Sequence, residues 1–383
     1  MKILTVLTYY RPHTSGLTIY AERLARAFAR RGHDVTVLTT QYDKSLPRQE
    51  ILDGIKVIRL PVAVRISKGV LAPTFGLVAT RLAWENDVVQ LHLPQFDAPG
   101  VAFRARLFGK SVVLTYHCDL LLPPGIFNRM VNLVVQFQNN MAGMLASHIV
   151  TYTQDYADHS AYLSRYRHKL KPILPPVELP AAVPGAVDTF AAQNQVSTRK
   201  PVIGMAARFA AEKGVEVLLD AMPKILEKFP NAQVLFAGQY QGVMGEQVYA
   251  ERLMPRIRDY EVGGHWKFLD VLSPQQMAAF YPNLDALVVP SLNSTEAFGL
   301  VQIEAMLNNV PCVASALPGV RQPVRMHSMG EVAAIGNAND LARGLLAVLS
   351  EPQKYRCDIN KLAELYDPDA VAAEYEKLFA KLR

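Results

Sequence analysis

Short apolar runs alternate with longer amphipathic stretches over the first 170 residues of the chain. The runs are apolar on both faces, which is typical of strands in a parallel sheet covered on both sides. The stretch 19–31 has the period of an amphipathic helix, with arginines largely on one face, and Gly32 is placed to end it. We predict strands at 3–7, 35–39, 56–60, 88–92, 111–116 and 149–153.

The same alternation resumes after residue 200. It predicts strands at 202–205, 232–237, 266–268, 286–289 and 312–315, and helices at 215–229 and 297–308. Between the halves, 171–200 holds closely spaced prolines followed by small and polar residues, the composition of a linker region. The pattern predicts an α/β fold with two Rossmann-like domains, 1–170 and 201–367, whose parallel sheets face each other across a cleft. Ligands of such sheets lie at the carboxyl ends of the strands.

The composition agrees with two packed cores. Of 383 residues, 50% are hydrophobic and 19% are charged, which excludes a disordered chain and a small disulfide scaffold. The cysteines Cys118, Cys312 and Cys357 are far apart and form no CxxC pair, so a reducing compartment fits best. The apolar stretches 70–78 and 126–146 are interrupted by proline or polar residues. We expect a cytoplasmic protein without a transmembrane helix or signal peptide.

Charge is unevenly distributed along the chain. Residues 1–180 hold 21 of the 40 basic side chains but 12 of the 34 acidic ones, which gives this half a net charge of +9 and leaves −3 for the rest. A basic half favours an anionic partner such as a membrane surface, a phosphorylated substrate or nucleic acid. Ordinary scatter of charge is the alternative.

Two glutamates, Glu296 and Glu304, stand eight residues apart around the start of a predicted helix. If both were helical, they would lie about 12 Å apart along the axis, which is too far to share a proton but suits two parts of an elongated ligand. If instead Glu296 lies in the entry loop and the helix starts near Ala297, the N–H groups of Phe298, Gly299 and Leu300 would form an anion site at the helix start. The alternative is a capping glutamate and an ordinary surface glutamate.

A second candidate lies in the loop after the strand at 202–205. Arg208 and Lys213 precede the next predicted helix there. A guanidinium and an ammonium at such a place suit a diphosphate, because the first gives fork-like contacts and the second a point charge. The alternative is that both are solvated cations paired with Glu212 or Glu216.

Other motifs are weaker. His117 directly follows the strand at 111–116 and is placed to face the cleft, although a lone histidine there can equally be structural, and no second ligand stands at metal spacing. The loop before the first helix ends in Gly16, but the chain has neither GxGxxG nor GxxxxGK[ST], which counts against nicotinamide, flavin and P-loop chemistry. Asp367 and Asp369 resemble a metal pair, but an N-cap of the last helix is the better interpretation.

Taken together, these residues resemble the retaining glycosyltransferases of family 4 (group 1), which have the two-domain architecture called GT-B. The resemblance covers nearly the whole chain. It rests on Ser15-Gly16, Tyr116-His117, the segment from Arg208 to Gly214, the segment from Pro290 to Glu304 with its Glu-x7-Glu spacing, and Leu317-Pro318-Gly319.

The resemblance implies a role for each site residue. The catalytic set would be His117 at the reaction centre, Arg208 and Lys213 on the donor diphosphate, and Glu296 on the transferred sugar. Glu304 would accept hydrogen bonds from the ribose, and backbone amides at Phe298, Gly299 and Leu300 would lie near the sugar and phosphates. Gly16 would let the first loop approach the phosphates, and the base would lie near Gly238, Gln239 and the segment 269–272, which includes Val271.

The implied activity is transfer of a sugar from a nucleotide-diphosphate sugar to a lipid-linked or saccharide acceptor. The resemblance further implies retention of anomeric configuration by a front-face route, a hexosyltransferase-like specificity, no metal, no cofactor and no nucleic-acid partner. The C-terminal helix, 368–383, would pack back on the N-terminal acceptor-binding domain, and the C-terminal domain would bind the donor. Two departures stand out: Asp270 and Asn309 occupy positions where the family usually has glycine.

Three alternatives remain open from the sequence. The first is a sugar-nucleotide epimerase or a phosphorylase on the same architecture, and the second is a non-catalytic module that binds anions or membranes. The third concerns only the acceptor side, where basic residues beside the apolar stretch 126–135 could place the N-terminal domain on the inner face of an anionic membrane. These residues are Arg65, Lys68, Arg104, Arg106, Lys110, Arg129 and the basic residues of 165–171.

Overall fold

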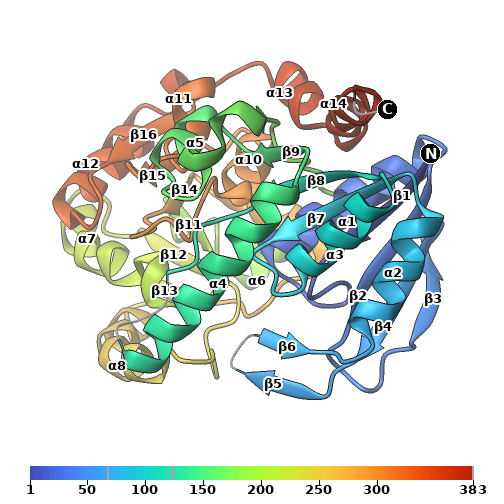
Figure 1. Ribbon diagram of the computed structural model, residues 1–383. Coiled ribbons are helices and arrows are strands. Elements are labelled where there is room, and N and C mark those ends of the chain that lie inside the picture. The colour runs from blue at the N-terminus through green and yellow to red at the C-terminus, as the bar shows by residue number, and fades with distance from the viewer. Residues whose placement is uncertain (67–68, 122–124, 382–383) are drawn as a thin grey trace. The chain divides into compact units, whose positions relative to one another are not determined.

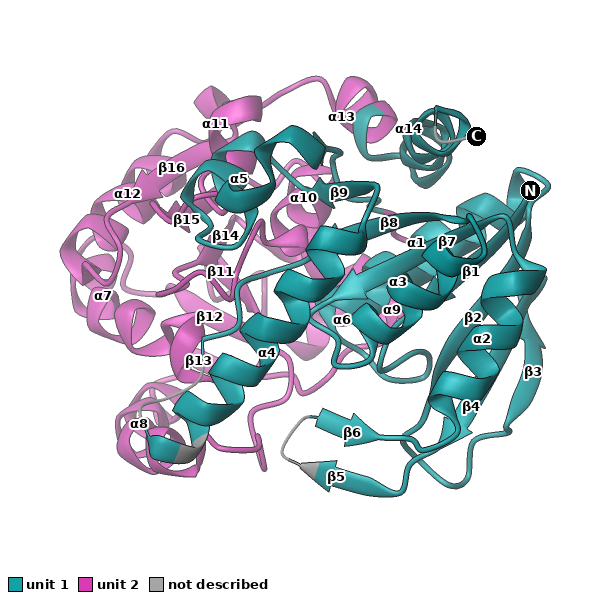
Figure 2. Ribbon diagram, in the orientation of Figure 1, with its two compact units in different colours: residues 1–177, 365–383 teal, residues 178–364 magenta. Residues whose placement is uncertain are grey.

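The computed structural model describes residues 1–66, 69–121 and 125–381. The chain forms two compact units, which are coloured separately in Figure 2. Unit 1 comprises Met1–Val177 and Leu365–Arg383, and unit 2 comprises Glu178–Glu364. The division at Val177 falls inside the stretch 171–200, for which we predicted a linker. That stretch also contains a strand, β10 (Leu170–Pro172), and a helix, α6 (Ala186–Gln193), so much of it is built into the two units.

Unit 1 is built on an eight-stranded sheet in the order β10-β9-β8-β7-β1-β2-β4-β3. All neighbours are parallel except β3 and β4. The inner strands are buried along most or all of their length, as predicted for a sheet covered on both faces. Their bounds are β1 (Lys2–Val6), β2 (Asp34–Gln41), β3 (Gln49–Leu52), β4 (Ile55–Pro61), β7 (Val88–Leu93), β8 (Ser111–Tyr116) and β9 (His148–Thr151), and a separate antiparallel pair is formed by β5 (Val64–Ile66) and β6 (Gly69–Leu71).

Most of the helices of unit 1 follow strands, as the alternation along the chain led us to expect. Figure 1 shows α3 between α2 and α4, and α3 contacts both of them. The helices are α1 (Gly16–Arg30), α2 (Phe75–Glu85), α3 (Ala98–Leu107), α4 (Ile126–Leu145), α5 (Gln154–His159), η1 (Leu163–Lys169) and α14 (Pro368–Ala380). α1 begins three residues before the predicted start because the Ser15 side chain accepts a hydrogen bond from the Thr18 N–H and caps it.

The C-terminal helix α14 belongs to unit 1. Its N-cap is Asp367, whose side chain accepts hydrogen bonds from the N–H groups of Asp369 and Ala370 at 2.9 Å, which confirms the capping interpretation of this pair. α14 packs on α1, where the hydroxyls of Tyr20 and Tyr375 are 2.8 Å apart. The helix expected over 368–383 ends at Ala380, and residues 382–383 lie outside the described part of the chain.

Unit 2 is built on a six-stranded parallel sheet in the order β13-β12-β11-β14-β15-β16. Three strands have the predicted bounds: β13 (Trp266–Phe268), β14 (Ala286–Val289) and β15 (Cys312–Ser315). The other strands are β11 (Val202–Ala206), β12 (Gln233–Ala237) and β16 (Gly330–Ala333).

The helices of unit 2 enclose a core that runs through the sheet, with Ile203, Phe236 and Val288 fully or almost fully buried. They are α6, α7 (Val215–Lys228), α8 (Gln247–Val262), α9 (Pro274–Phe280), α10 (Leu300–Met306), α11 (Gln322–His327) and α12 (Ala338–Ser350), with short 3-10 turns η2 (Ala211–Lys213), η3 (Tyr281–Asn283) and η4 (Pro352–Tyr355). α13 (Ile359–Tyr366) carries the chain from unit 2 back to unit 1. Among the described residues, no helix is long and apolar enough to cross a membrane.

Candidate active site

Two loops of unit 2 meet at the carboxyl edge of the sheet, one after β11 and one after β14. Gly214 has a φ of +68°, and a Cβ there would lie 2.2 Å from the carbonyl oxygen of Pro290. Glycine is therefore required at this position by both backbone conformation and space. The Leu292 N–H also donates to the carbonyl of Glu212 at 2.9 Å, which fastens the second loop to the first.

This loop contact brings together two residues that the sequence had assigned to separate motifs. Lys213 Nζ and Glu296 Oε2 form an ion pair at 2.6 Å, and their side chains are only 19% and 21% exposed. Arg208 pairs instead with Glu212 at 3.0 Å, which is one of the pairings weighed from the sequence. A cluster of two cations and two carboxylates thus lies at the ends of β11 and β14.

The helix after β14 starts later than predicted. α10 begins at Leu300, not at 297, because Gly299 adopts the left-handed region with φ 76° and ψ 74° and serves as the N-cap. Glu296 therefore lies in a turn, where its N–H donates to the Asn293 carbonyl at 3.2 Å. The helical relation expected between Glu296 and Glu304 does not apply, since only Glu304 is in the helix.

The shorter helix also changes which backbone groups are presented at its start. The first helical N–H groups are those of Leu300 and Val301, because Gln302 N already donates to the Gly299 carbonyl at 2.9 Å. Phe298, which we expected to offer an amide at the helix start, lies before the cap, and its side chain is buried. A Cβ at Gly299 would stand 2.9 Å from Nε2 of buried Gln302, so both the left-handed backbone and the packing favour glycine at this position.

Glu304 is buried and held by a partner that the sequence analysis missed. The hydroxyl of Tyr281 donates to Glu304 Oε2 at 2.6 Å. Tyr281 lies in η3, which precedes β14 in the chain, and no motif spacing pointed to it. The contact fixes the orientation of this carboxylate.

Gln302 is a second missed residue. Its side chain is fully buried, and Nε2 donates to the carbonyls of Phe298 at 2.8 Å and Val320 at 2.9 Å. These two bonds tie the Gly299 turn to the segment that follows Leu317-Pro318-Gly319. A buried amide with two backbone acceptors holds the start of α10 in one conformation.

The loops after β11, β12 and β13 are joined in the same way. Gly238 has a φ of +139°, and a Cβ there would lie 2.0 Å from the Ala207 carbonyl oxygen. Its N–H donates to the Asp270 carbonyl at 2.7 Å, and Phe209 N donates to the Gln239 carbonyl at 2.8 Å. Val271 follows Asp270 at this edge and is exposed.

The two unusual residues noted in the sequence have a conformational explanation. Asp270 has a φ of 55° and Asn309 a φ of 60°. Both are in the left-handed region that favours glycine, and aspartate and asparagine are the side chains that tolerate it best. The backbone of this protein thus keeps the conformation that a glycine would allow.

In unit 1, His117 lies at the carboxyl end of β8 and is buried. Its Nε2 is 2.8 Å from Nδ1 of His92, and its Nδ1 is hydrogen-bonded to the Tyr152 hydroxyl. Burial lowers the pKa of His117 well below its usual value and that of His92 to about 3. Both imidazoles are therefore neutral near pH 7, and both nitrogens of His117 have partners.

Gly16 lies in the first turn of α1, after the loop that follows β1. A Cβ at this position would meet no atom within 4 Å, and its φ is not in the left-handed region. The fold itself therefore makes no demand for glycine here. The space beside this residue is open.

Comparison with known proteins decides the family. Residues 15–176 match the model of the glycosyl transferase 4-like domain, and residues 187–364 match that of the glycosyl transferases group 1. The chain belongs to this family of glycosyltransferases. The family assignment and the GT-B fold expected from the sequence are thereby confirmed.

The relatives of this glycosyltransferase span nearly its full length. It is 26% identical to an uncharacterized glycosyltransferase of Methanocaldococcus jannaschii over 92% of this chain and 90% of that protein. It is 25% identical to the phosphatidyl-myo-inositol mannosyltransferase of Mycobacterium tuberculosis over 99% of this chain and 96% of the relative.

Solved structures show the same fold. The Anabaena protein HepE in complex with UDP-glucose superposes with a TM-score of 0.78 at 19% identity, covering 100% of both chains. Sucrose-phosphate synthase from Thermosynechococcus elongatus also gives 0.78, at 21% identity, covering 100% of this chain and 98% of the other. Within the described part of this glycosyltransferase, no group of three or more His, Cys, Asp or Glu side chains is arranged to hold a metal ion.

Proposed function

We propose that the protein transfers a sugar from a nucleotide-diphosphate sugar to an acceptor hydroxyl, with retention of configuration and without a metal ion. The observation that carries this proposal is the ion pair between Lys213 and Glu296, which joins the two loops that the family pattern assigns to the donor. Structural neighbours bound to UDP and UDP-glucose support a donor of this class.

We assign the donor's diphosphate to Arg208, Lys213 and the first N–H groups of α10. An ammonium carries three donors, so Lys213 can keep its bond to Glu296 while it donates to a phosphate oxygen. The ion pair then places Glu296, the proposed partner of the transferred sugar's hydroxyls, next to the phosphate that leaves it. Gly299 contributes through its left-handed backbone, which leads the chain into α10.

The nucleoside would extend from the diphosphate along the same edge of the sheet. Glu304, oriented by Tyr281, accepts hydrogen bonds from the ribose hydroxyls. The base lies against the joined loops at Gly238 and Val271, whose backbone N–H and C=O groups can read its edge. Positive φ at Asp270 keeps that loop in the shape it needs.

Charge stabilisation explains how this site would work without a metal. As the nucleoside diphosphate departs, negative charge develops on its terminal phosphate, and the guanidinium and ammonium stabilise that charge without reorganising. Retention follows if the acceptor attacks from the face that the phosphate leaves, with the acceptor proton passing to the departing phosphate oxygen. Glu296 is engaged by Lys213, which disfavours it as a nucleophile on the opposite face.

We propose a positioning role for His117 rather than an acid–base role. Both of its ring nitrogens are engaged and burial keeps it neutral, so it has no nitrogen ready to exchange a proton with substrate. We infer that the ring fixes the carboxyl end of β8 beside the acceptor. Open space at Gly16 leaves room for a ligand at the end of β1.

We further propose that the acceptor is carried by an anionic membrane on which unit 1 docks through α4. Ile126, Leu133 and Phe137 are 93%, 63% and 63% exposed, and with exposed Met130 they recur at helical spacing on one face of α4. We call these four residues the α4 stripe. Exposed Arg129 lies beside it and can reach lipid phosphates. The lipid named in the mycobacterial relative, phosphatidyl-myo-inositol, is an acceptor of this kind.

Some of the basic residues first assigned to the membrane have structural roles instead. Lys169 Nζ donates to the carbonyls of Gly143, Met144 and Ala146 and so caps the end of α4. Arg104 is half-buried and bonds to Thr80 and the Gly100 carbonyl. Lys68 lies outside the described residues.

A combined binding and transfer experiment tests the function. The purified protein is screened for thermal stabilisation by UDP, GDP and ADP with and without a chelator, and is then incubated with the matching sugar nucleotide and vesicles that carry candidate acceptors. We expect one diphosphate to stabilise the protein equally in both conditions, and glycosylated product that retains the anomeric configuration. Stabilisation that requires a metal, or an altered sugar nucleotide without any acceptor, would contradict the proposal, and the latter would favour an epimerase.

A further inference from the structure

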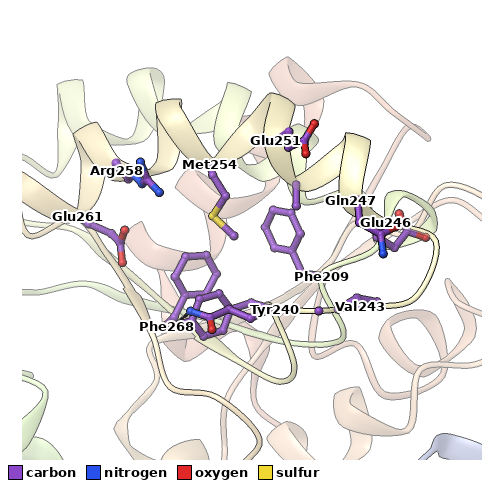
Figure 3. Close-up of a pocket in the computed structure, with 13 residues that line it drawn as sticks. Phe209, Tyr240, Val243, Glu246, Gln247, Glu251, Met254, Arg258, Glu261 and Phe268 are labelled. Atoms are coloured by element: carbon purple, nitrogen blue, oxygen red, sulfur yellow. Dashed lines mark hydrogen bonds between the residues drawn. The ribbon is translucent and has the colours of Figure 1, made fainter.

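A pocket of about 440 Å³ lies beneath α8 in unit 2 (Figure 3). Its volume is within the range of small-molecule sites. Phe209, Tyr240 and Phe268 form one wall, and Ala250 and Met254 of α8 form the facing wall. The pocket is lined by none of the residues assigned above to the donor, which are Arg208, Lys213, Gly238, Val271, Glu296, Gly299, Leu300 and Glu304.

The aromatic side of the pocket is firmly supported. The rings of Tyr240 and Phe268 stack with centroids 4.1 Å apart and planes 7° apart, so each ring covers one face of the other. Phe268 also contacts Phe236 and Phe209, at 5.4 Å and 6.1 Å between ring centroids. A rigid aromatic surface of this kind loses little conformational entropy when a flat apolar face packs against it.

Polar groups gather toward the two ends of the pocket. Figure 3 shows Glu246 and Gln247 at one end and Arg258 and Glu261 at the other, with Met254 extending from α8 toward the rings between them. Glu246 Oε2 accepts a hydrogen bond from the Ala211 N–H at 3.0 Å, which anchors its end of the pocket to the loop after β11.

The charges of the lining narrow the class of ligand. Three carboxylates against one guanidinium disfavour a phosphorylated or otherwise anionic ligand. The same balance admits a cation, so a cationic probe belongs in the test. The polar lining offers both donors and acceptors. A sugar hydroxyl donates and accepts as well, and a sugar ring has an apolar C–H face that fits an aromatic wall.

We propose that this pocket is an accessory site for a neutral saccharide, separate from the donor site. The sugar ring packs its C–H face on the aromatic lining formed by Phe209 and the Tyr240–Phe268 stack, and its hydroxyls bond to the polar side chains at the two ends. Such a site would hold a sugar unit of a glycan on the donor unit while transfer takes place elsewhere. It requires no nucleotide, so it can fail or succeed independently of the proposed function.

A natural reporter lies next to the pocket. Trp266 is buried, with its ring centroid 6.0 Å from that of Phe268, and the other of the two tryptophans, Trp84, is exposed on α2. In Trp84→Phe protein the tryptophan emission therefore comes from Trp266 alone. This protein is titrated with maltose, cellobiose and mannobiose, and with glucose 6-phosphate and choline as charged probes, while calorimetry follows the same titrations.

Two substitutions in opposite walls test the location. Tyr240→Ala removes half of the aromatic stack, and Ala250→Phe fills the space facing it. The control, Val262→Ser, changes a residue of the same helix that is 91% exposed and does not line the pocket. UDP binding is measured for each variant, because Tyr240 follows Gln239 in the donor loops.

We expect saturable binding of at least one neutral disaccharide, weakened about tenfold or more by each wall substitution and unchanged by Val262→Ser. Ala250→Phe should leave UDP binding unchanged. The proposal is overturned if no disaccharide binds at concentrations up to about 20 mM, which is well above a dissociation constant in the low millimolar range. It is also overturned if both wall variants bind like the control, or if only a charged probe binds.

Discussion

The carboxyl edges of the two sheets are built on different principles. In unit 2 the edge consists of loops that touch through glycines, and its charged side chains, such as Lys213 and Glu296, pair across those loops. In unit 1 the edge at β8 is a buried network in which His117 joins His92 and Tyr152. The first edge presents charge, while the second is a buried hydrogen-bonded network of neutral groups in which His92 Nε2 has no partner among the described residues.

This difference indicates how each edge contributes to function. Paired charges on short loops can bind a ligand in addition to their partner at little cost, because the loop backbones are held by other bonds. A buried network of neutral rings cannot do this without leaving polar atoms unpaired. We therefore place the chemistry of transfer in unit 2 and give unit 1 a role in holding and orienting the acceptor.

The largest expected effect is on Lys213. Lys213→Ala removes a cation from the proposed diphosphate site and leaves Glu296 without its partner, so we expect kcat for transfer to fall about 10³-fold. The measurement is initial rate at saturating donor. Lys200→Ala serves as the control, since Lys200 forms an exposed pair with Asp285 in the same unit. A fall of less than about threefold in Lys213→Ala, within ordinary surface effects, would remove Lys213 from the mechanism.

The buried histidines of unit 1 should make the stability of the protein depend on pH. The folded-state pKa of His92 is about 3, below its value in the unfolded chain, so the unfolded state binds more protons between these values. Stability is therefore lost as pH falls below about 6.5. Between pH 7 and pH 5, we expect the free energy of unfolding to fall by up to about 2 kcal/mol less in His92→Asn than in the wild-type protein.

Urea unfolding at a series of pH values measures this effect. The comparison uses the slope with pH rather than absolute stability, because the substitution also removes the hydrogen bond to His117. If the slopes of the wild-type protein and His92→Asn coincide, His92 is not a buried neutral residue. The contrast between the two edges would then lose its physical basis.

The α4 stripe gives a third way to test the division of roles. A Leu133→Glu, Phe137→Glu double variant places two carboxylates on the exposed apolar face, and we expect partition onto anionic vesicles to fall about tenfold or more. Val262→Glu in unit 2 adds a carboxylate at a still more exposed position and serves as the control. Equal partition of all three proteins in a flotation assay would show that α4 does not contact the membrane.

The smallest expected effect is on Tyr281. Tyr281→Phe removes one hydrogen bond to Glu304 but leaves the carboxylate in place, so we expect UDP affinity to weaken about fivefold, equivalent to about 1 kcal/mol. Calorimetric titration with UDP is sufficient. Glu304→Gln should weaken binding more than Tyr281→Phe does, and the reverse order would show that the tyrosine contacts the nucleotide itself.

The sequence predicted the order of the strands and helices well because the inner strands are buried on both faces and therefore apolar throughout. The strands it missed, such as β3 and β16, are short and lie at sheet edges, where apolar periodicity is weak. The start of α10 was predicted three residues too early. The apolar pattern of this helix already begins at Ala297 and Phe298. The helix itself starts only after Gly299, whose left-handed backbone is not helical.

For the site, residues in compact motifs were recognisable and residues that act through tertiary contact were not. Arg208, Lys213 and Glu304 stand in a local pattern, whereas Tyr281 and Gln302 acquire their roles only when the chain brings Glu304 or Val320 beside them. The pairing of Lys213 with Glu296 could not be predicted from the sequence either. It depends on the contact between Gly214 and the Pro290 carbonyl, which joins segments about eighty residues apart.

The most direct test of the central claim is a crystal structure of the protein soaked with its sugar nucleotide. The account predicts that the diphosphate oxygens lie within hydrogen-bond distance of Lys213 Nζ and the Arg208 guanidinium, with Glu296 still bound to Lys213. A diphosphate found away from both cations would contradict it.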